Sequence, residues 1–280
     1  MLLIADSGST KCDWLLLSDS GEVLESHTMG LNPFFHSAEF MAQKMLANPL
    51  LESNRNAITE IQYYGAGCSS PDRNNIVEVG LKTIFPNASE IDVAEDMQAA
   101  ALATCKGEKG IVCILGTGSN SCYFDGTKIN KKVPALGYVL GDEGSGAFIG
   151  KQLIKHYLYK TLPHTIESTI AQLGFSNNDL LSKVYREPHA NVFLASLVKE
   201  ISMHNDHPFI QKIIKSGFKE FAEIHIQCFE NYQSLPVHFV GSIAYYYIDM
   251  LTIVSAELDF KVGKIVKQPI KELAERKSKV

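Results

Sequence analysis

Apolar and polar positions follow one pattern that occurs twice along the chain. The first copy covers residues 2–21 and the second covers residues 111–126. In each copy, an apolar run is followed by small polar residues, by a second apolar run and by a turn that contains Gly21 or Gly126. This order predicts a strand, a small-residue turn, a second strand, a glycine turn and a third strand. The chain is therefore expected to consist of two duplicated halves.

Small residues fill the first turn of each copy. The turns contain Ser7, Gly8, Ser9, Thr10 and Lys11 in the first copy, and Gly116, Thr117, Gly118 and Ser119 in the second. Such turns expose backbone N–H groups and hydroxyls where no bulky side chain blocks a phosphate. Either turn alone is better explained by a β-hairpin without a ligand, but the pair predicts that both halves hold one polyphosphate and that the chain is an ATP-using enzyme. Lys11 is either a phosphate contact or a surface lysine.

Alternating helical and strand periods follow each copy and predict an α/β fold. In the first half we expect strands at 60–64 and 90–94 and helices at 36–47, at 72–85 and from Asp96 onward. In the second half we expect mostly helix over 147–232, then a strand at 237–240, a helix at 243–257, a strand at 260–266 and a helix after Pro269. The polar, glycine-containing segment 106–110 predicts domains at 1–106 and 107–280, and it is left open whether the terminal helix packs back on the first domain.

Composition excludes several function classes. The 280 residues are 45% hydrophobic, and 26 basic against 31 acidic residues give a net charge of -5, which does not favour nucleic-acid binding. No apolar run approaches about 18 residues and no positive leader opens the chain, so we expect a soluble, cytoplasmic protein without a membrane partner. The six cysteines show no C-x-x-C spacing and are predicted to be free thiols. The nine histidines form no ligand set, and we expect them to be hydrogen-bonded or at the surface.

Three motifs together resemble a known superfamily. The motifs are Asp6-Ser7-Gly8-Ser9-Thr10-Lys11, Gly116-Thr117-Gly118-Ser119-Asn120 and Leu140-Gly141-Asp142-Glu143-Gly144-Ser145. They are similar to motifs of the actin-like ATPases and sugar kinases, and within these of the N-acetylglucosamine kinase branch that is grouped with the BadF/BadG/BcrA/BcrD-type ATPases. The resemblance implies an α/β fold of two duplicated ribonuclease H-like (actin-like ATPase) domains with a central interdomain cleft. Ser7 departs from the pattern, because these kinases usually have a second glycine there.

Two aspartates are candidates for the chemistry of phosphoryl transfer. Asp6 ends the first strand just before the turn, so its carboxylate can hold Mg²⁺, directly or through water; the alternative is a local Asx turn. Asp96 opens a helix, where capping and the helix dipole favour an acidic residue in any case. The resemblance implies that Asp96 is the general base that deprotonates a sugar hydroxyl.

Further polar and small residues are candidates for ligand binding. For the sugar, these are Asn32, Gly67, Thr117, Gly141, Asp142, Glu143 and Ser145, which offer amide, carboxylate and small-residue contacts to hydroxyls and to an acetamido group. A solvated turn is the alternative for Asp142 and Glu143. The resemblance implies that Gly241 and Ser242 contact the adenosine, and an ordinary serine-capped helix is the alternative there.

The residues and the resemblance lead to one favoured function. We expect ATP-dependent phosphorylation of an aminosugar, N-acetylglucosamine at its 6-hydroxyl, with ATP and Mg²⁺ as cofactors, a small-molecule sugar as partner, and a homodimer left open. One alternative is an ATPase of the dehydratase-activator type, which needs cysteines that bridge a dimer and usually has Gly-Gly-Gln-Asp at its second turn; neither feature occurs here. The other is a nucleotide-binding regulator without catalysis, since the superfamily hosts many activities.

Overall fold

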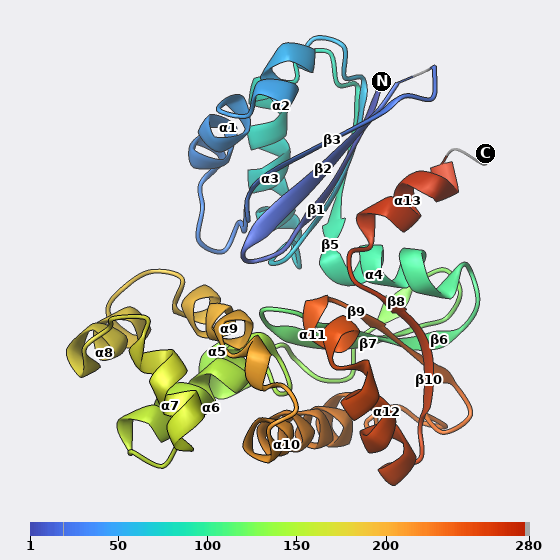
Figure 1. Ribbon diagram of the computed structural model, residues 1–280. Helices are drawn as coiled ribbons and strands as arrows, with labels where there is room; N and C mark the ends of the chain where they lie inside the picture. The colour runs from blue at the N-terminus through green and yellow to red at the C-terminus, as the bar shows by residue number, and fades with distance from the viewer. Residues whose placement is uncertain (19, 278–280) are drawn as a thin grey trace. The chain divides into compact units, whose positions relative to one another are not determined.

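The computed structural model describes residues 1–18 and 20–277, and its chain divides into two units (Figure 1). The first unit comprises Met1–Lys106 and the segment that begins at Gln268, and the second comprises Gly107–Lys267. Two parts of the chain lie outside the described residues: Asp19, in the turn expected at residues 19–21, and the last three residues of the range 107–280. The helix after Pro269, which that range assigned to the second domain, belongs to the first unit.

The described part of the first unit contains a mixed five-stranded sheet in the order β3-β2-β1-β4-β5. The strands are β1 (Leu2–Ser7), β2 (Lys11–Leu17), β3 (Val23–Met29), β4 (Glu60–Gly65) and β5 (Glu90–Glu95). The helices are α1 (Ala38–Leu46), α2 (Pro49–Asn54), α3 (Pro71–Ile84), α4 (Asp96–Cys105) and α13 (Ile270–Lys277). The first three strands pair antiparallel, whereas β4 pairs parallel to β1 and β5 pairs parallel to β4.

The described part of the second unit repeats this topology, in the order β10-β9-β6-β7-β8. Its strands are β6 (Gly110–Leu115), β7 (Ser119–Phe124), β8 (Ile129–Asn130), β9 (Pro236–Val240) and β10 (Lys261–Val266). Its helices are α5 (Gly137–Leu140), α6 (Gly146–Leu158), α7 (His164–Ala171), α8 (Asn177–Tyr185), α9 (Ala190–Glu200), α10 (Pro208–His225), α11 (Ser242–Tyr246) and α12 (Ile248–Glu257), with a 3₁₀ turn at Ser202–His204. Because β6, β7, β9 and β10 pair as β1, β2, β4 and β5 do, the predicted α/β fold and its duplication are confirmed.

The two faces of the first sheet are covered by different helices. Successive side chains of a strand point to opposite faces. Leu3, Trp14 and Leu16 join a buried cluster with residues of α1 and α3, whereas Ile4 and Leu15 pack with residues of α4 and α13. Asp6 is two residues from Ile4 and therefore lies on the α4 and α13 face.

The second unit carries its core on a larger set of helices. Residues of β6 and β9 form one buried cluster with residues of α6, α7, α9, α10 and α12. The helix expected at 243–257 is interrupted at Tyr247. This buried residue lies between α11 and α12 and belongs to neither, so the two helices are separate. Among the described residues, we find no helix with the length and apolar content needed to span a membrane.

Candidate functional site

The first turn connects β1 to β2 and rests on a glycine from elsewhere in the unit. The Gly8 N–H donates to the Lys11 carbonyl at 2.9 Å, and the Gly30 N–H donates to the Thr10 carbonyl at 3.1 Å. A Cβ on Gly30 would overlap the backbone of Gly8 and Ser9. Gly30, which the sequence analysis did not single out, thus lets the strand end of β3 support the turn directly.

Ser7 has a structural role in the first unit, and the phosphate contact expected of it stays a prediction. Its side chain is fully buried, donates to the Leu31 carbonyl at 3.1 Å and accepts from the Leu31 N–H at 2.9 Å. Its hydroxyl is therefore committed as donor and acceptor at once. A second glycine here, as in the resembled kinases, would lose both bonds.

Asp6 and Asp96 lie at the carboxyl end of the parallel strands. Asp6 is the last residue but one of β1, Asp96 directly follows β5, and both strands run parallel to β4 between them. Burial, and after it the negative charges of Asp96 and Asp13, raise the pKa of Asp6 to about 7. Asp13 is the direct partner of Asp6 across the β1-β2 pair. The fold therefore brings the two predicted catalytic carboxylates into mutual electrostatic contact.

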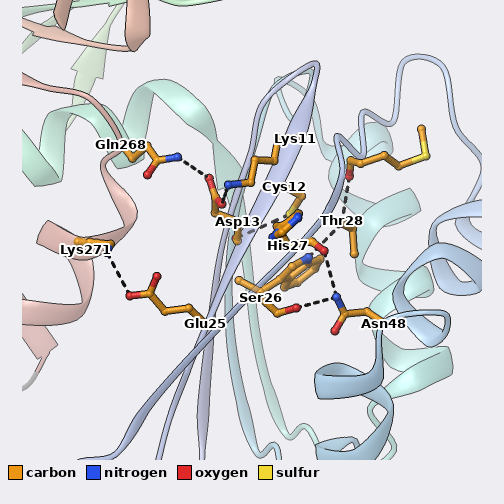
Figure 2. A network of polar contacts seen from close by, with 12 residues as sticks. Lys11, Cys12, Asp13, Glu25, Ser26, His27, Thr28, Asn48, Gln268 and Lys271 are labelled. Atoms are coloured by element: carbon orange, nitrogen blue, oxygen red, sulfur yellow. Dashed lines mark hydrogen bonds and ion pairs between the residues drawn. The ribbon is translucent and has the colours of Figure 1, made fainter.

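Lys11 is exposed and pairs with an acid on its own strand. Its ammonium lies 2.5 Å from the Asp13 carboxylate, and the Gln268 amide donates to the other oxygen of Asp13 at 3.2 Å (Figure 2). Nearby, Lys271 of α13 forms an ion pair with Glu25 of β3 at 3.2 Å. The surface role that the sequence left open for Lys11 matches this geometry, and a phosphate contact would require Lys11 to leave Asp13.

Asn32 and Gly67, two predicted sugar contacts, lie against each other. The Asn32 carboxamide oxygen accepts from the Phe34 N–H at 2.8 Å, which fixes the side chain. Gly67 has a φ of 84°, and a Cβ there would overlap that same carboxamide. Only glycine allows both this backbone conformation and this close approach. The structure thus joins two loops that are 35 positions apart into one small polar surface.

The second turn, between β6 and β7, is bound to the start of α6. The N–H groups of Gly146 and Ala147 donate to the carbonyls of Gly116 and Thr117 at 2.8 and 3.0 Å. The first N–H groups of a helix have no partner within the helix, so these bonds satisfy two of them. The turn is therefore fixed by the segment 141–146 that the sequence had singled out separately.

Asp142 and Ser145 hold this arrangement in place. The Asp142 carboxylate accepts from the Ser119 N–H at 3.1 Å, and Asp142 itself has a φ of 57°. Ser145 is fully buried and caps α6 by accepting from the Phe148 N–H at 3.1 Å. The Ser145 hydroxyl thus caps a helix, and its sugar contact stays a prediction. The buried Gly141, at the end of α5, donates its N–H to the Gly137 carbonyl at 2.8 Å.

Glu143 is buried and has a partner that sequence reasoning missed. Its carboxylate lies 3.4 Å from His225 Nε2 on α10, and His225 Nδ1 lies 3.2 Å from the Ser121 hydroxyl on β7. Burial lowers the pKa of His225, while Glu143 opposes that shift. The solvated turn considered for this residue is excluded. No local signal pointed to His225, because it is 82 residues from Glu143.

Gly241 lies beside the second turn. Its φ is 120°, and a Cβ there would overlap the Leu115 carbonyl and approach the Gly116 nitrogen. Ser242 is exposed at the start of α11. The three segments 116–119, 141–146 and 241–242, which are far apart in sequence, thus meet at one end of the second sheet.

Two observations bear on a phosphate and a magnesium ion. The Ser119 hydroxyl is buried at the second turn and has no hydrogen-bond partner among the described residues, which is costly unless a ligand supplies one. At Asp6, a nearby cation would favour the charged form that burial and Asp96 now disfavour. Within residues 1–18 and 20–277, no three acidic, histidine or cysteine side chains are placed to hold a metal. Mg²⁺ commonly takes only one or two carboxylates together with substrate phosphates, so Asp6 fits such an ion when a nucleotide is present.

The duplicated topology, with a small-residue turn between the first two strands of each unit, is that of the actin-like ATPases and sugar kinases. No protein-family model matches the sequence. A crystal structure of a candidate N-acetylglucosamine kinase from Porphyromonas gingivalis is 36% identical, with a TM-score of 0.90 and coverage of 98% of each chain. A ROK family glucokinase from Streptomyces griseus, solved with glucose and AMPPNP, shares the fold at 12% identity and a TM-score of 0.56, over 98% of each chain.

A curated relative points the same way over a shorter segment. The N-acetylmuramic acid/N-acetylglucosamine kinase of Clostridium acetobutylicum is 30% identical over 145 residues. That match spans 49% of this chain and 46% of the curated protein, so about half of each is compared. Together with the full-length match, it confirms the resemblance inferred from the three motifs. The chain belongs to the N-acetylglucosamine kinase-like family of sugar kinases.

Proposed function

We propose that this protein transfers the γ-phosphoryl group of ATP to the 6-hydroxyl of N-acetylglucosamine. The observation that carries the proposal is the pair Asp6 and Asp96 at the carboxyl ends of β1 and β5, beside the first turn. Phosphoryl transfer depends on positioning and on electrostatic stabilisation, and it needs a base near the attacking hydroxyl. The two acids can divide these tasks between them.

Asp96 is the proposed general base. One of its carboxylate oxygens accepts from the Met97 N–H at 2.9 Å, which orients the side chain at the start of α4. The helix N-terminus favours the ionised form, the form that accepts a proton. Asp96 would therefore take the proton of the sugar hydroxyl as the oxygen attacks the γ-phosphorus.

Asp6 is the proposed magnesium ligand. When bound, Mg²⁺ neutralises charge on the phosphates during transfer. The cation would favour the ionised form of Asp6 at pH values below its pKa of about 7, where burial and Asp96 otherwise favour the protonated form. The raised pKa thus couples the charge state of Asp6 to nucleotide binding.

The two turns are proposed to contact phosphate and the loops to contact sugar. Backbone N–H groups of residues 9–10 and 117–118 and the Ser119 hydroxyl would donate to phosphate oxygens, and Gly241 and Ser242 would contact the adenosine. Asn32 and Gly67, which already lie against each other, would bind sugar, with Asp142 and Glu143 as further contacts. Thr117 and Gly141 complete the proposed set.

A panel of sugars tests the proposal. If the acetamido group is recognised by buried polar atoms, N-acetylglucosamine should exceed glucose in kcat/KM by about tenfold or more, since each unpaired buried group costs about 1–3 kcal/mol. Phosphorylation should be followed by mass spectrometry with N-acetylglucosamine, N-acetylmuramic acid, N-acetylmannosamine and glucose. Equal specificity constants would leave a general sugar kinase. ATP hydrolysis without sugar turnover would favour the activator-type ATPase, and nucleotide binding without hydrolysis would favour the regulator.

A further inference from the structure

The segment 141–146 is attached to β7 at two points. Asp142 accepts directly from the Ser119 N–H, and Glu143 reaches the Ser121 hydroxyl through His225. Ser119 and Ser121 are two residues apart on one strand and therefore lie on the same face of the sheet. The carboxylates of Asp142 and Glu143 are thus both connected to β7. Asp142 is connected by a hydrogen bond from the backbone, and Glu143 is connected through the His225 side chain.

The connection through His225 is enclosed in the core. Ser121, His225 and Glu143 are 0%, 3% and 9% exposed. The imidazole stacks on Phe221, with ring centroids 4.8 Å apart and an interplanar angle of 17°. Gly144, with a φ of 69°, lies so close to α10 that a Cβ would be 3.0 Å from the Gly217 carbonyl. The segment therefore packs on the same helix that supplies His225.

The hydrogen-bond pattern determines which ring nitrogen carries the proton. An ionised Glu143 can only accept, so Nε2 donates to it and the Ser121 hydroxyl donates to Nδ1 of a neutral imidazole. This assignment gives both ring nitrogens of His225 a partner. Without the imidazole, the buried Glu143 carboxylate would lose its donor, and it would then turn away from α10 to find another partner.

We propose that His225 is a positioning residue: by donating to Glu143, it holds the Asp142-Glu143 pair in the conformation in which segment 141–146 supports the second turn and contacts the sugar. His225 touches neither substrate in this proposal and acts only through Glu143. The effect on turnover rests on the function proposed above. The effect on the backbone of the segment does not, and it can be measured without any substrate.

Two amide substitutions separate the two contacts of the imidazole. In His225→Gln the side-chain NH₂ can reach the place of Nε2 and still donate to Glu143, whereas in His225→Asn the amide is too short and reaches only toward Ser121. We expect His225→Asn to raise the KM for N-acetylglucosamine about tenfold and the KM for ATP about threefold or more, because the second turn loses support, with kcat changed less than about threefold. His225→Gln should stay within about threefold of the wild type in all three constants. His204→Asn is the matched control, since it removes another imidazole that contacts a hydroxyl, that of Thr169 at 2.7 Å.

Hydrogen exchange gives the substrate-free measurement. In His225→Asn, the amides of Ser119 and Gly146 should exchange at least about tenfold faster than in the wild type, whereas His225→Gln and His204→Asn should leave them protected. Equal protection in His225→Asn and the wild type would overturn the proposal, as would equal losses in the Asn and Gln variants. If the wild type turns over no sugar, the proposed function fails, but the exchange data still decide whether His225 positions the segment.

Discussion

The small-residue turns of the two units have the same topology, but the side chains around them differ. The first turn, at residues 8–10, lies beside three aspartates, and its nearby lysine is already paired with Asp13. The second turn, at residues 116–118, has its carbonyls bound by the start of α6 and its following residue bound by Asp142. The two copies thus share the backbone topology, whereas their side chains differ. The first turn lies among negatively charged side chains, and the second is hydrogen-bonded to a buried segment.

This difference implies different consequences of mutation. Changes beside the first turn remove charged groups that a reaction needs, and they should affect turnover or its dependence on pH. Changes beside the second turn remove groups that fix a conformation, and they should affect binding and stability.

The largest effect is expected for Asp96→Asn. The amide keeps the shape of the side chain but cannot accept a proton, so kcat should fall about 10²-fold or more while the KM values for ATP and sugar change little. Steady-state kinetics and calorimetric binding of both substrates measure this. Asp92→Asn, on the exposed side of β5, is the matched control and should be nearly silent. Near-normal kcat in Asp96→Asn would remove this residue from the mechanism.

Asp6→Asn should lower activity and raise the stability of the protein without ligands. The folded protein keeps the Asp6 proton up to a pKa of about 7, whereas the ordinary pKa of an aspartate is 3.8, so the free energy of unfolding of the wild type falls as pH rises from about 4 to 7. At pH 8 the Asn variant should therefore be more stable, by roughly 1–3 kcal/mol once solvent screening at this half-buried site is allowed for. Urea denaturation should show this advantage shrinking toward pH 4. A constant difference over this range would contradict the proposed protonation of Asp6.

Gly8→Ala and Gly116→Ala test whether both turns bind phosphate closely. A Cβ on Gly8 would meet only the Lys11 carbonyl at 3.7 Å, and a Cβ on Gly116 would meet nothing within 4 Å. Both variants should therefore fold normally, yet raise the KM for ATP about fivefold or more if a phosphate approaches the backbone there. Gly30→Ala is the contrast, because it overlaps the first turn and should lower the melting temperature. If only one of the first two variants weakens ATP binding, the other turn is a plain hairpin.

The smallest effect is expected for Ser119→Ala. The variant removes a buried hydroxyl that has no partner in the described protein, so stability should stay level or rise by up to about 1 kcal/mol. If this hydroxyl donates to a phosphate, the KM for ATP should rise about threefold to tenfold. Ser121→Ala, two residues along β7, should show the reverse, with lower stability and an unchanged KM for ATP, because its hydroxyl contacts His225. An unchanged KM in both would exclude Ser119 from the phosphate site.

Local sequence patterns determined the strands, the two turns and the duplication. A run of apolar residues that ends in glycine and serine specifies a strand and its turn through interactions within a few residues, and the same pattern at residues 2–17 and 111–124 produced the same pairing in both units. The helix opened by Asp96 and the terminal helix after Pro269 were also predictable, because an acidic residue in the first turn and a proline before a helix act locally. The three motifs were enough to indicate the family.

Only the tertiary structure decided which of the candidate residues have free side chains and which are committed to the fold. Ser7 and Ser145 are of a residue type expected at ligand contacts, yet their hydroxyls form hydrogen bonds with Leu31 and with the start of α6. His225 looked unremarkable in sequence, yet it is the buried partner of Glu143. The physical reason is that burial obliges each polar group to find a partner, and that partner is chosen by the packing of distant segments. The sequence by itself therefore determined which chemical groups this protein carries, and the tertiary structure decided which of them the fold itself uses.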